Sequence, residues 1–208
     1  MKKQIYIWLF TVLLFVEYSH GQGLVQITFD GPPVQSPGTA TLITNYSEAG
    51  MSFTPIDLAN RNQAFVRQGG AVSFYPEDGT TYLQAGFGST LMFSFTNGSV
   101  FSMLFVDLAE YSTVVPNAVT VEFVGYHPDG STVTTSFTTD GIIDGTGPLA
   151  DFQTFSFSGL GFSDLTRVEI PTYGWSLDNL VVATPEPTGG ALLAIGGMVL
   201  GAWHWRKK

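Results

Sequence analysis

The side chains of this sequence that could do chemistry are mostly carboxylates. Residues 22–184 lie between two apolar termini and contain no cysteine and a single histidine, His127. The lack of cysteine excludes thiol catalysis and thiolate metal sites. His127 lies in a Pro-Asp-Gly turn, and neither a G-x-S-x-G nor an H-E-x-x-H motif occurs. A glycosidase-like carboxylate pair stays open, because its members meet only in space. We predict that the chain is not an enzyme.

Carboxylates also suit a hard cation. Calcium takes about 6–8 oxygen ligands, and loops of a β-sandwich can supply them without histidine or cysteine. Asp30 follows the first expected strand and Asp178 lies in the last one, so these two are the candidate metal ligands. The alternative, that Asp178 and Asn179 bond to neighbouring backbone, stays open. A second, weaker group of acids is Asp140, Asp144 and Asp151.

Aromatic rings offer a third kind of chemistry, because a planar ring can stack on the C–H face of a sugar. Trp175 is the only tryptophan between residues 22 and 184, and it lies two residues after Tyr173. We predict Tyr173 and Trp175 as candidate carbohydrate-binding residues, with a core or edge role as the alternative. The other candidate rings are Tyr75, Tyr82, Tyr111 and Tyr126.

Charge narrows the choice of partner. Residues 22–184 carry 15 acidic residues and only three arginines, which gives a net charge of −12. Such a surface repels nucleic acid and acidic membranes, so phosphate-backbone binding is excluded as a main role. Neutral polysaccharide, divalent cations and simple solubility are all compatible with it.

The elements that must position these residues are strands. Short alternating runs separated by turn residues predict an all-β fold with one antiparallel β-sandwich, jelly-roll-like, over residues 22–183. In the last strand we expect Leu177 and Val181 on one face, and Leu180 and Val182 towards the other. The expected alternating runs are Val25–Phe29, Leu91–Phe95, Val119–Phe123, Val133–Phe137 and Thr154–Ser158.

Turn residues mark one hairpin and leave one segment ambiguous. Pro128-Asp129-Gly130 is a strong turn signal and predicts a hairpin between the strands that flank it. Residues 104–115 are harder to assign, because Leu108-Ala109-Glu110 also suits a helical turn.

Both termini predict export. Residues 1–21 combine a basic start, a twelve-residue apolar run and small residues at Ser19 and Gly21, which fits a signal peptide cleaved before Gln22. An uncleaved anchor is the alternative. At the other end, residues 189–205 carry no formal charge and span about 25 Å as a helix, close to the roughly 30 Å of a bilayer core. Basic residues at both ends predict that the body lies outside the cytoplasm.

The C-terminal segment 184–208 resembles the PEP-CTERM sorting signal of exported bacterial proteins. The matching parts are the motif Pro185-Glu186-Pro187, the transmembrane helix 189–205 and the basic end 206–208. An ordinary C-terminal anchor is the alternative. The resemblance implies an exosortase-type processing enzyme as partner, anchoring in the bacterial inner membrane before processing, and delivery to the cell surface or exopolysaccharide matrix.

The body also resembles some jelly-roll carbohydrate-binding modules, through the ending Leu-Asp-Asn-Leu-Val-Val at 177–182. In those modules an acid near the first strand and one in the last share a structural calcium. The resemblance implies Asp178 as a ligand, with Asp30 as its partner. We therefore predict a non-enzymatic surface or matrix protein, with a carbohydrate-binding module that holds a structural calcium as the alternative.

Overall fold

The computed structural model describes residues 22–56, 64–68, 74–86, 90–114, 117–143 and 151–185. Residues 24–184 form one compact unit. The described residues contain strands and no helix, so the predicted all-β class is confirmed. The strands are β1 (Gln22–Ile27), β2 (Ala40–Ile43), β3 (Tyr46–Glu48), β4 (Met51–Ile56), β5 (Ala64–Gln68), β6 (Thr81–Ala85), β7 (Thr90–Phe95), β8 (Ser102–Glu110), β9 (Thr120–Tyr126), β10 (Thr132–Thr138), β11 (Gln153–Ser156), β12 (Arg167–Ile170) and β13 (Trp175–Pro185).

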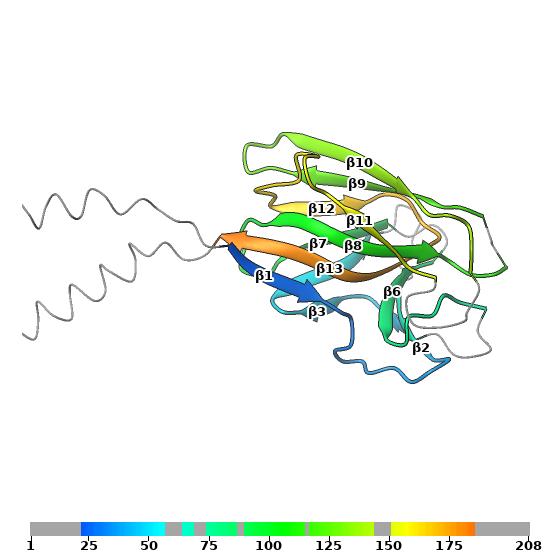
Figure 1. Ribbon diagram of the computed structural model, residues 1–208. Coiled ribbons are helices and arrows are strands. Elements are labelled where there is room, and N and C mark those ends of the chain that lie inside the picture. Colours follow the sequence, from blue (N-terminus) through cyan, green and yellow to red (C-terminus); the bar gives the residue numbers. More distant parts are fainter. Residues whose placement is uncertain are drawn as a thin grey trace, which may run out of the picture. The chain divides into compact units, whose positions relative to one another are not determined.

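Two antiparallel sheets make the predicted sandwich (Figure 1). Sheet A has the order β11-β8-β13-β6-β5-β2, and β1 also pairs with β13. Sheet B has the order β10-β9-β12-β7-β4-β3. The chain crosses repeatedly from one sheet to the other, as in a jelly roll. The predicted hairpin is confirmed, since β9 and β10 pair across the turn at His127–Ser131.

The ambiguous segment is extended rather than helical. Leu108-Ala109-Glu110 ends strand β8, which pairs with β11 on one side and β13 on the other. All three residues pair with β13, and Leu108 pairs with β11 as well, so sheet pairing overrides the local preference for a helical turn.

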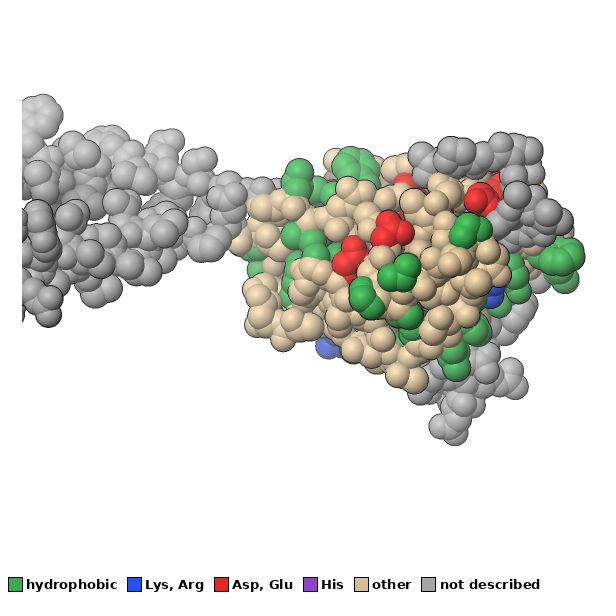
Figure 2. Space-filling view, turned by 90° about the horizontal axis from the view of Figure 1, so that it is seen from below, with side chains coloured by type: hydrophobic (Ala, Val, Ile, Leu, Met, Phe, Trp, Pro, Cys, Tyr) green, Lys and Arg blue, Asp and Glu red, His purple; other side chains and the backbone are tan. Residues whose placement is uncertain are grey.

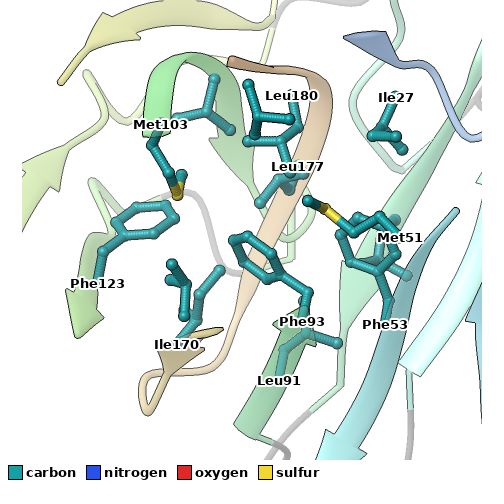
Figure 3. Packing of buried hydrophobic residues seen from close by; sticks show 14 of the residues in the cluster. Ile27, Met51, Phe53, Leu91, Phe93, Met103, Phe123, Ile170, Leu177 and Leu180 are labelled. Carbon is teal, nitrogen blue, oxygen red and sulfur yellow. The ribbon is translucent and has the colours of Figure 1, made fainter. Parts of the chain in front are cut away.

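Alternating aromatic and aliphatic residues fill the space between the sheets. Phe53, Phe93 and Phe123 are fully buried and come from three strands of sheet B. Phe53 and Phe93 stack with ring centroids 5.3 Å apart. The face seen from below shows mostly uncharged polar side chains and backbone, with scattered acidic and hydrophobic side chains (Figure 2). The close view of the core shows Leu177 and Leu180 of β13 entering it beside Met103 and Ile27 (Figure 3).

Strand β13 departs from simple alternation. The pairing of β13 with β8 shifts between Asp178 and Val181, and Asn179 has a φ of 45°. This β-bulge inserts one extra residue, so Leu177 and Leu180 both reach the core while Val181 points the other way. The expected common face for Leu177 and Val181 is therefore wrong. Leu180 and Val182 do share a face, and it is the core face.

A carboxylate holds the segment that follows β1. Phe29 is fully buried at a φ of 57°, a left-handed conformation that is costly for a bulky residue. The Glu48 carboxylate accepts hydrogen bonds from the backbone N–H groups of Thr28 (3.0 Å) and Phe29 (2.8 Å). It also accepts one from the Tyr46 hydroxyl (2.6 Å), which itself accepts one from the Gly31 N–H (3.2 Å).

The predicted terminal elements fall mainly outside the described residues. Pro185 ends β13, whereas residues 1–21, Glu186, Pro187 and residues 188–208 are not described. Within the part of the chain that is described, no helix has the length and apolarity to cross a membrane.

Replacing Glu48 by glutamine should destabilise the fold. The glutamine amide would turn an N–H donor towards another donor, at a cost of about 1–3 kcal/mol for an unsatisfied part-buried group. We expect the Tm of the full chain in mild detergent to fall by about 3–10 °C in thermal unfolding. Glu169→Gln is the matched control, because Glu169 bonds to a tyrosine and an arginine on a half-exposed face. Equal losses in the two variants would contradict this role of Glu48.

Candidate functional site on the outer face of sheet A

The outer face of sheet A carries polar side chains, as an exposed face would, yet many of these side chains are buried. Ser176 and Asp178 of β13 and Gln84 of β6 are completely inaccessible to solvent. Gln84 Nε2 donates to the backbone oxygen of Tyr111 (2.7 Å) and to Ser176 Oγ (3.1 Å). Segments outside the sheet therefore cover this part of the face.

A pair of buried carboxyl groups lies on this face. The Asp178 side chain of β13 lies beside that of Asp78, close enough for the two carboxyl groups to interact; Asp78 precedes β6 and is 5% exposed. Thr80 Oγ1 donates to Asp178 Oδ2 (3.2 Å), and the Thr80 N–H donates to Asp78 Oδ1 (2.8 Å). Asp78 Oδ2 and Asp178 Oδ1 are buried and have no hydrogen-bond partner among the described residues. The short turn at residues 78–80 thus joins the two carboxyl groups.

Burial and proximity change the acidity of this pair. Burial above all, and then the hydrogen bond to Asp78 and its negative charge, raise the pKa of Asp178 from 3.8 to about 10. Two carboxylates this close in a dry site cannot both ionise without a compensating charge. The pair therefore holds either one proton or a cation at neutral pH.

Asp30 lies beside the same turn. Its Oδ1 accepts a hydrogen bond from the Thr81 N–H (3.1 Å), one residue after the hydroxyl that bonds to Asp178. The structure therefore brings both predicted metal ligands to the turn at residues 78–81, although Asp30 is exposed and Asp178 is not. Glu48 fixes the backbone just before Asp30, through the Thr28 and Phe29 N–H groups.

The donor atoms at this turn suit a hard cation. Asp78 and Asp178 provide two buried carboxylates and Thr80 provides a hydroxyl, all oxygen ligands of the kind that calcium prefers. Among the described residues, no group of three or more acidic, histidine or cysteine side chains could hold a metal ion. Backbone oxygens or water would have to complete the coordination.

The second acidic group does not form a site in the described structure. Asp140 Oδ1 accepts from the Ile142 N–H (2.9 Å) in its own turn. Asp151 is buried and its Oδ2 accepts from the Glu77 N–H (2.9 Å), next to the carboxyl pair. Asp144 is outside the described residues. Asp151 thus contributes negative charge near the pair. Burial above all, then the charge of Asp78 and then that of Asp151, raise the pKa of Glu77.

A row of polar side chains crosses the open part of the same face. Gln26 Nε2 donates to Asn179 Oδ1 (2.9 Å), and Asn179 Nδ2 donates to Asp107 Oδ2 (3.0 Å). Thr154 Oγ1 donates to Asp107 Oδ1 (2.5 Å). Four strands contribute to this row, and the exposed ring of Phe105 lies on the same strand as Asp107. Sequence reasoning missed the row because its members are far apart along the chain.

The two residues predicted to bind sugar, Tyr173 and Trp175, differ in their exposure to solvent. Trp175 is fully buried in the core, and its Nε1 donates to the backbone oxygen of Thr172 (2.8 Å). This prediction is wrong for Trp175, because a ring without exposed surface cannot stack on a sugar. Tyr173 is 52% exposed and retains an accessible ring.

The remaining candidate tyrosines have different environments. Tyr82 is fully buried beside Phe152, with ring centroids 5.2 Å apart. The Arg67 guanidinium stacks on the half-buried ring of Tyr75 at 3.6 Å from its centroid. Tyr75 and Tyr111 meet edge to face, and the Tyr111 backbone accepts a hydrogen bond from Gln84. Both tyrosines therefore belong to the segments that cover Gln84. Tyr126 lies on sheet B beneath Arg167.

The raised pKa of Asp178 predicts how the stability of the domain depends on pH. Because the pKa of Asp178 is raised on folding, its proton stabilises the native state fully below about pH 4, and this contribution is lost as pH rises towards about 10. The asparagine of Asp178→Asn cannot ionise, so this variant does not lose that contribution as pH rises. With chelator present, the Tm of the variant minus the Tm of wild type should therefore increase by roughly 3–5 °C per pH unit between pH 5 and 9. Asp164→Asn, at an exposed acid, should show no such trend. A difference between Asp178→Asn and wild type that stays constant with pH would refute the shared proton.

Comparison with known proteins gives no family assignment. No protein-family model matches the sequence, and no curated protein matches it. Among solved structures, a mutant family 29 carbohydrate-binding module has a TM-score of 0.34 and 11% identity, covering 79% of this chain and 87% of that one. A family 11 module from Clostridium thermocellum, in complex with a β-1,3-1,4-mixed-linked tetrasaccharide, has a TM-score of 0.30 and 10% identity, covering 78% of this chain and 96% of that one.

Proposed function

We propose that the chain is an exported, non-enzymatic protein of the cell surface or exopolysaccharide matrix, sorted through its PEP-CTERM-like tail. The observation that carries the proposal is the position of the motif. Strand β13 runs through the middle of sheet A and ends at Pro185, the first residue of Pro185-Glu186-Pro187. An exosortase-type enzyme that cuts at this motif would release a folded domain with its last strand complete. Before cleavage the inner membrane would hold the chain through residues 189–205.

The carboxyl pair supports a non-enzymatic role. Glycosidases hold two carboxyl groups about 5–9.5 Å apart, with substrate between them. Asp78 and Asp178 instead contact each other and are closed off from solvent. They therefore contribute to structure or ion binding rather than to hydrolysis.

A second candidate function is carbohydrate binding with a structural calcium ion. The observation that favours calcium is the pair of unpartnered buried oxygens, Asp78 Oδ2 and Asp178 Oδ1. Asp78, Asp178 and Thr80 would hold the ion, with Asp30 beside them at the same turn. When bound, the ion would supply the positive charge that lets both buried carboxyls ionise. Tyr173 remains the candidate ring for sugar contact.

Processing of the tail is tested by mass spectrometry of the protein from its native cells. We expect the mature form to lack the basic end 206–208 and to end near the motif. A variant with Pro185→Ala, Glu186→Ala and Pro187→Ala should keep its full C-terminus and stay in the membrane fraction. An intact C-terminal peptide in mature wild-type protein would contradict sorting by cleavage.

Calcium binding is tested by thermal unfolding of the full chain in mild detergent. At about 100 times the Kd, bound calcium should raise Tm on the order of 5–10 °C relative to chelator. The increase should be larger at pH 8 than at pH 5, since protons compete for the carboxyls. Asp78→Asn should lose the increase, and Asp164→Asn should keep it. An unchanged wild-type Tm would remove the calcium site but leave the sorting proposal intact.

A further inference from the structure

One margin of the sandwich is a long, uncharged strand. β10 is the last strand of sheet B on its side and pairs with β9 alone among the described strands (Figure 1). The strands at the other ends of the two sheet orders, β2, β3 and β11, have three or four residues, whereas β10 has seven. β1, which pairs with β13 beside the main order of sheet A, has six. Proteins usually protect such margins with short strands, charges or proline, because an open edge can pair with another chain.

The hydrogen-bond pattern shows which residues of β10 face the open side. The Thr139 N–H donates to Val119 O and the His127 N–H donates to Ser131 O, so odd-numbered residues of this segment bond to β9. In an antiparallel ladder the intervening residues direct their N–H and C=O groups to the opposite side. Thr132, Thr134, Ser136 and Thr138 therefore present their backbone groups at the open edge. The side chains of these four residues are exposed.

The sequence of β10 contains none of the residues that commonly protect an edge strand from pairing. Thr-Val-Thr-Thr-Ser-Phe-Thr contains no charge, no proline and no glycine, although the domain around it carries a net charge of −12. Its pattern is also self-complementary. If a second copy pairs antiparallel about Thr135, hydroxyl-bearing Thr134 faces Ser136, and Val133 faces Phe137. Hydroxyl pairs and aromatic pairs with β-branched residues each favour cross-strand pairing.

Half-exposed apolar side chains lie along the same margin. Phe137 of β10 and Phe155 of β11 stack with centroids 5.0 Å apart, and both are only partly buried against the core. Val133 is also partly buried. A strand added beside β10 would cover this remaining apolar surface, at about 25 cal/mol per Å².

We propose that β10 is a homotypic assembly edge, which pairs antiparallel with β10 of a second copy of this chain about Thr135. The partner it fits is an uncharged strand of the same alternation, because a charged strand would leave its charges against Phe137 and Val133. Pairing would join two sheets B into one continuous sheet of two copies. Such a contact suits a protein that acts in a matrix, but it does not depend on tail processing or calcium.

Cysteine cross-linking tests this pairing, since the natural chain contains no cysteine. In the proposed register Thr135 meets its own equivalent in a non-hydrogen-bonded pair, with Cα atoms about 4.5 Å apart, which is within disulfide reach. We expect Thr135→Cys in the full chain, with detergent micelles in excess over chains, to form disulfide dimers under mild oxidation. The rate should exceed that of Thr120→Cys, on the neighbouring internal strand β9, by about tenfold.

A second substitution separates edge pairing from other contacts. Thr134→Pro removes an N–H that points to the open edge and leaves the ladder to β9 intact. Added to Thr135→Cys, it should lower the cross-linking rate about tenfold, whereas Thr134→Val keeps the N–H and should not lower it. Equal cross-linking at Thr135→Cys and Thr120→Cys would overturn the proposal. If Thr134→Pro and Thr134→Val change the cross-linking rate equally, in variants whose Tm matches that of wild type, the proposal is also overturned.

Discussion

The β-bulge at Asn179 decides what the central strand β13 presents to each side of sheet A. The left-handed residue adds one position, so Leu177 and Leu180 both enter the core. It also leaves Asp178 on the outer face, where the turn at residues 78–80 covers it. The Asn179 side chain then joins Gln26 and Asp107 in the polar row on the outer face. Without the extra residue, alternation would exchange the core and outer faces for the second half of the strand.

Burial of the Asp78–Asp178 pair destabilises the folded state, and other interactions of the fold have to offset this free-energy cost. An unpaired buried charge costs several kcal/mol, which is a large part of a typical net stability of about 5–15 kcal/mol. A shared proton or a bound cation removes most of that cost, and Thr80 satisfies one oxygen of each carboxyl. The charge of residues 22–184 has the same consequence, because their 15 acids and three arginines leave little positive charge to compensate Asp178. The state of this pair therefore links pH and divalent cations to the stability of the domain.

The sequence predicts the fold because turns and alternation are local signals. It does not predict the whole site, because strand pairing between distant segments brings the site together. Pro128-Asp129-Gly130 and the alternation in β9 and β10 are read correctly, because neighbouring residues determine them. The bulge at Asn179 is missed, since only the pairing with β8 reveals the extra residue. The sequence also predicts Trp175 at a sugar site, which is wrong, because the burial of one aromatic residue beside a glycine cannot be read from the sequence.

The candidate site shows the same division. Asp30 and Asp178 are predicted, and both reach one turn, but Asp78 is missed. The signal that could have found it is Asp78-Gly79-Thr80, a turn immediately before β6. Only the pairing of β6 with β13 places that turn against Asp178, and no spacing in the sequence states this pairing. The assembly edge at β10 is different, since its uncharged alternation is visible in the sequence while its position at the margin is not.

The ionisation state of Asp178 is the property on which this account depends most. It can be followed directly by NMR, through the ¹³C chemical shift of the side-chain carboxyl as a function of pH, in the full chain with chelator present. We predict that the Asp178 carboxyl stays protonated at pH 7 and titrates towards pH 10, and that added calcium removes its proton at neutral pH if the ion binds there. Titration of Asp178 near pH 4, in folded protein without any cation, would contradict the buried pair.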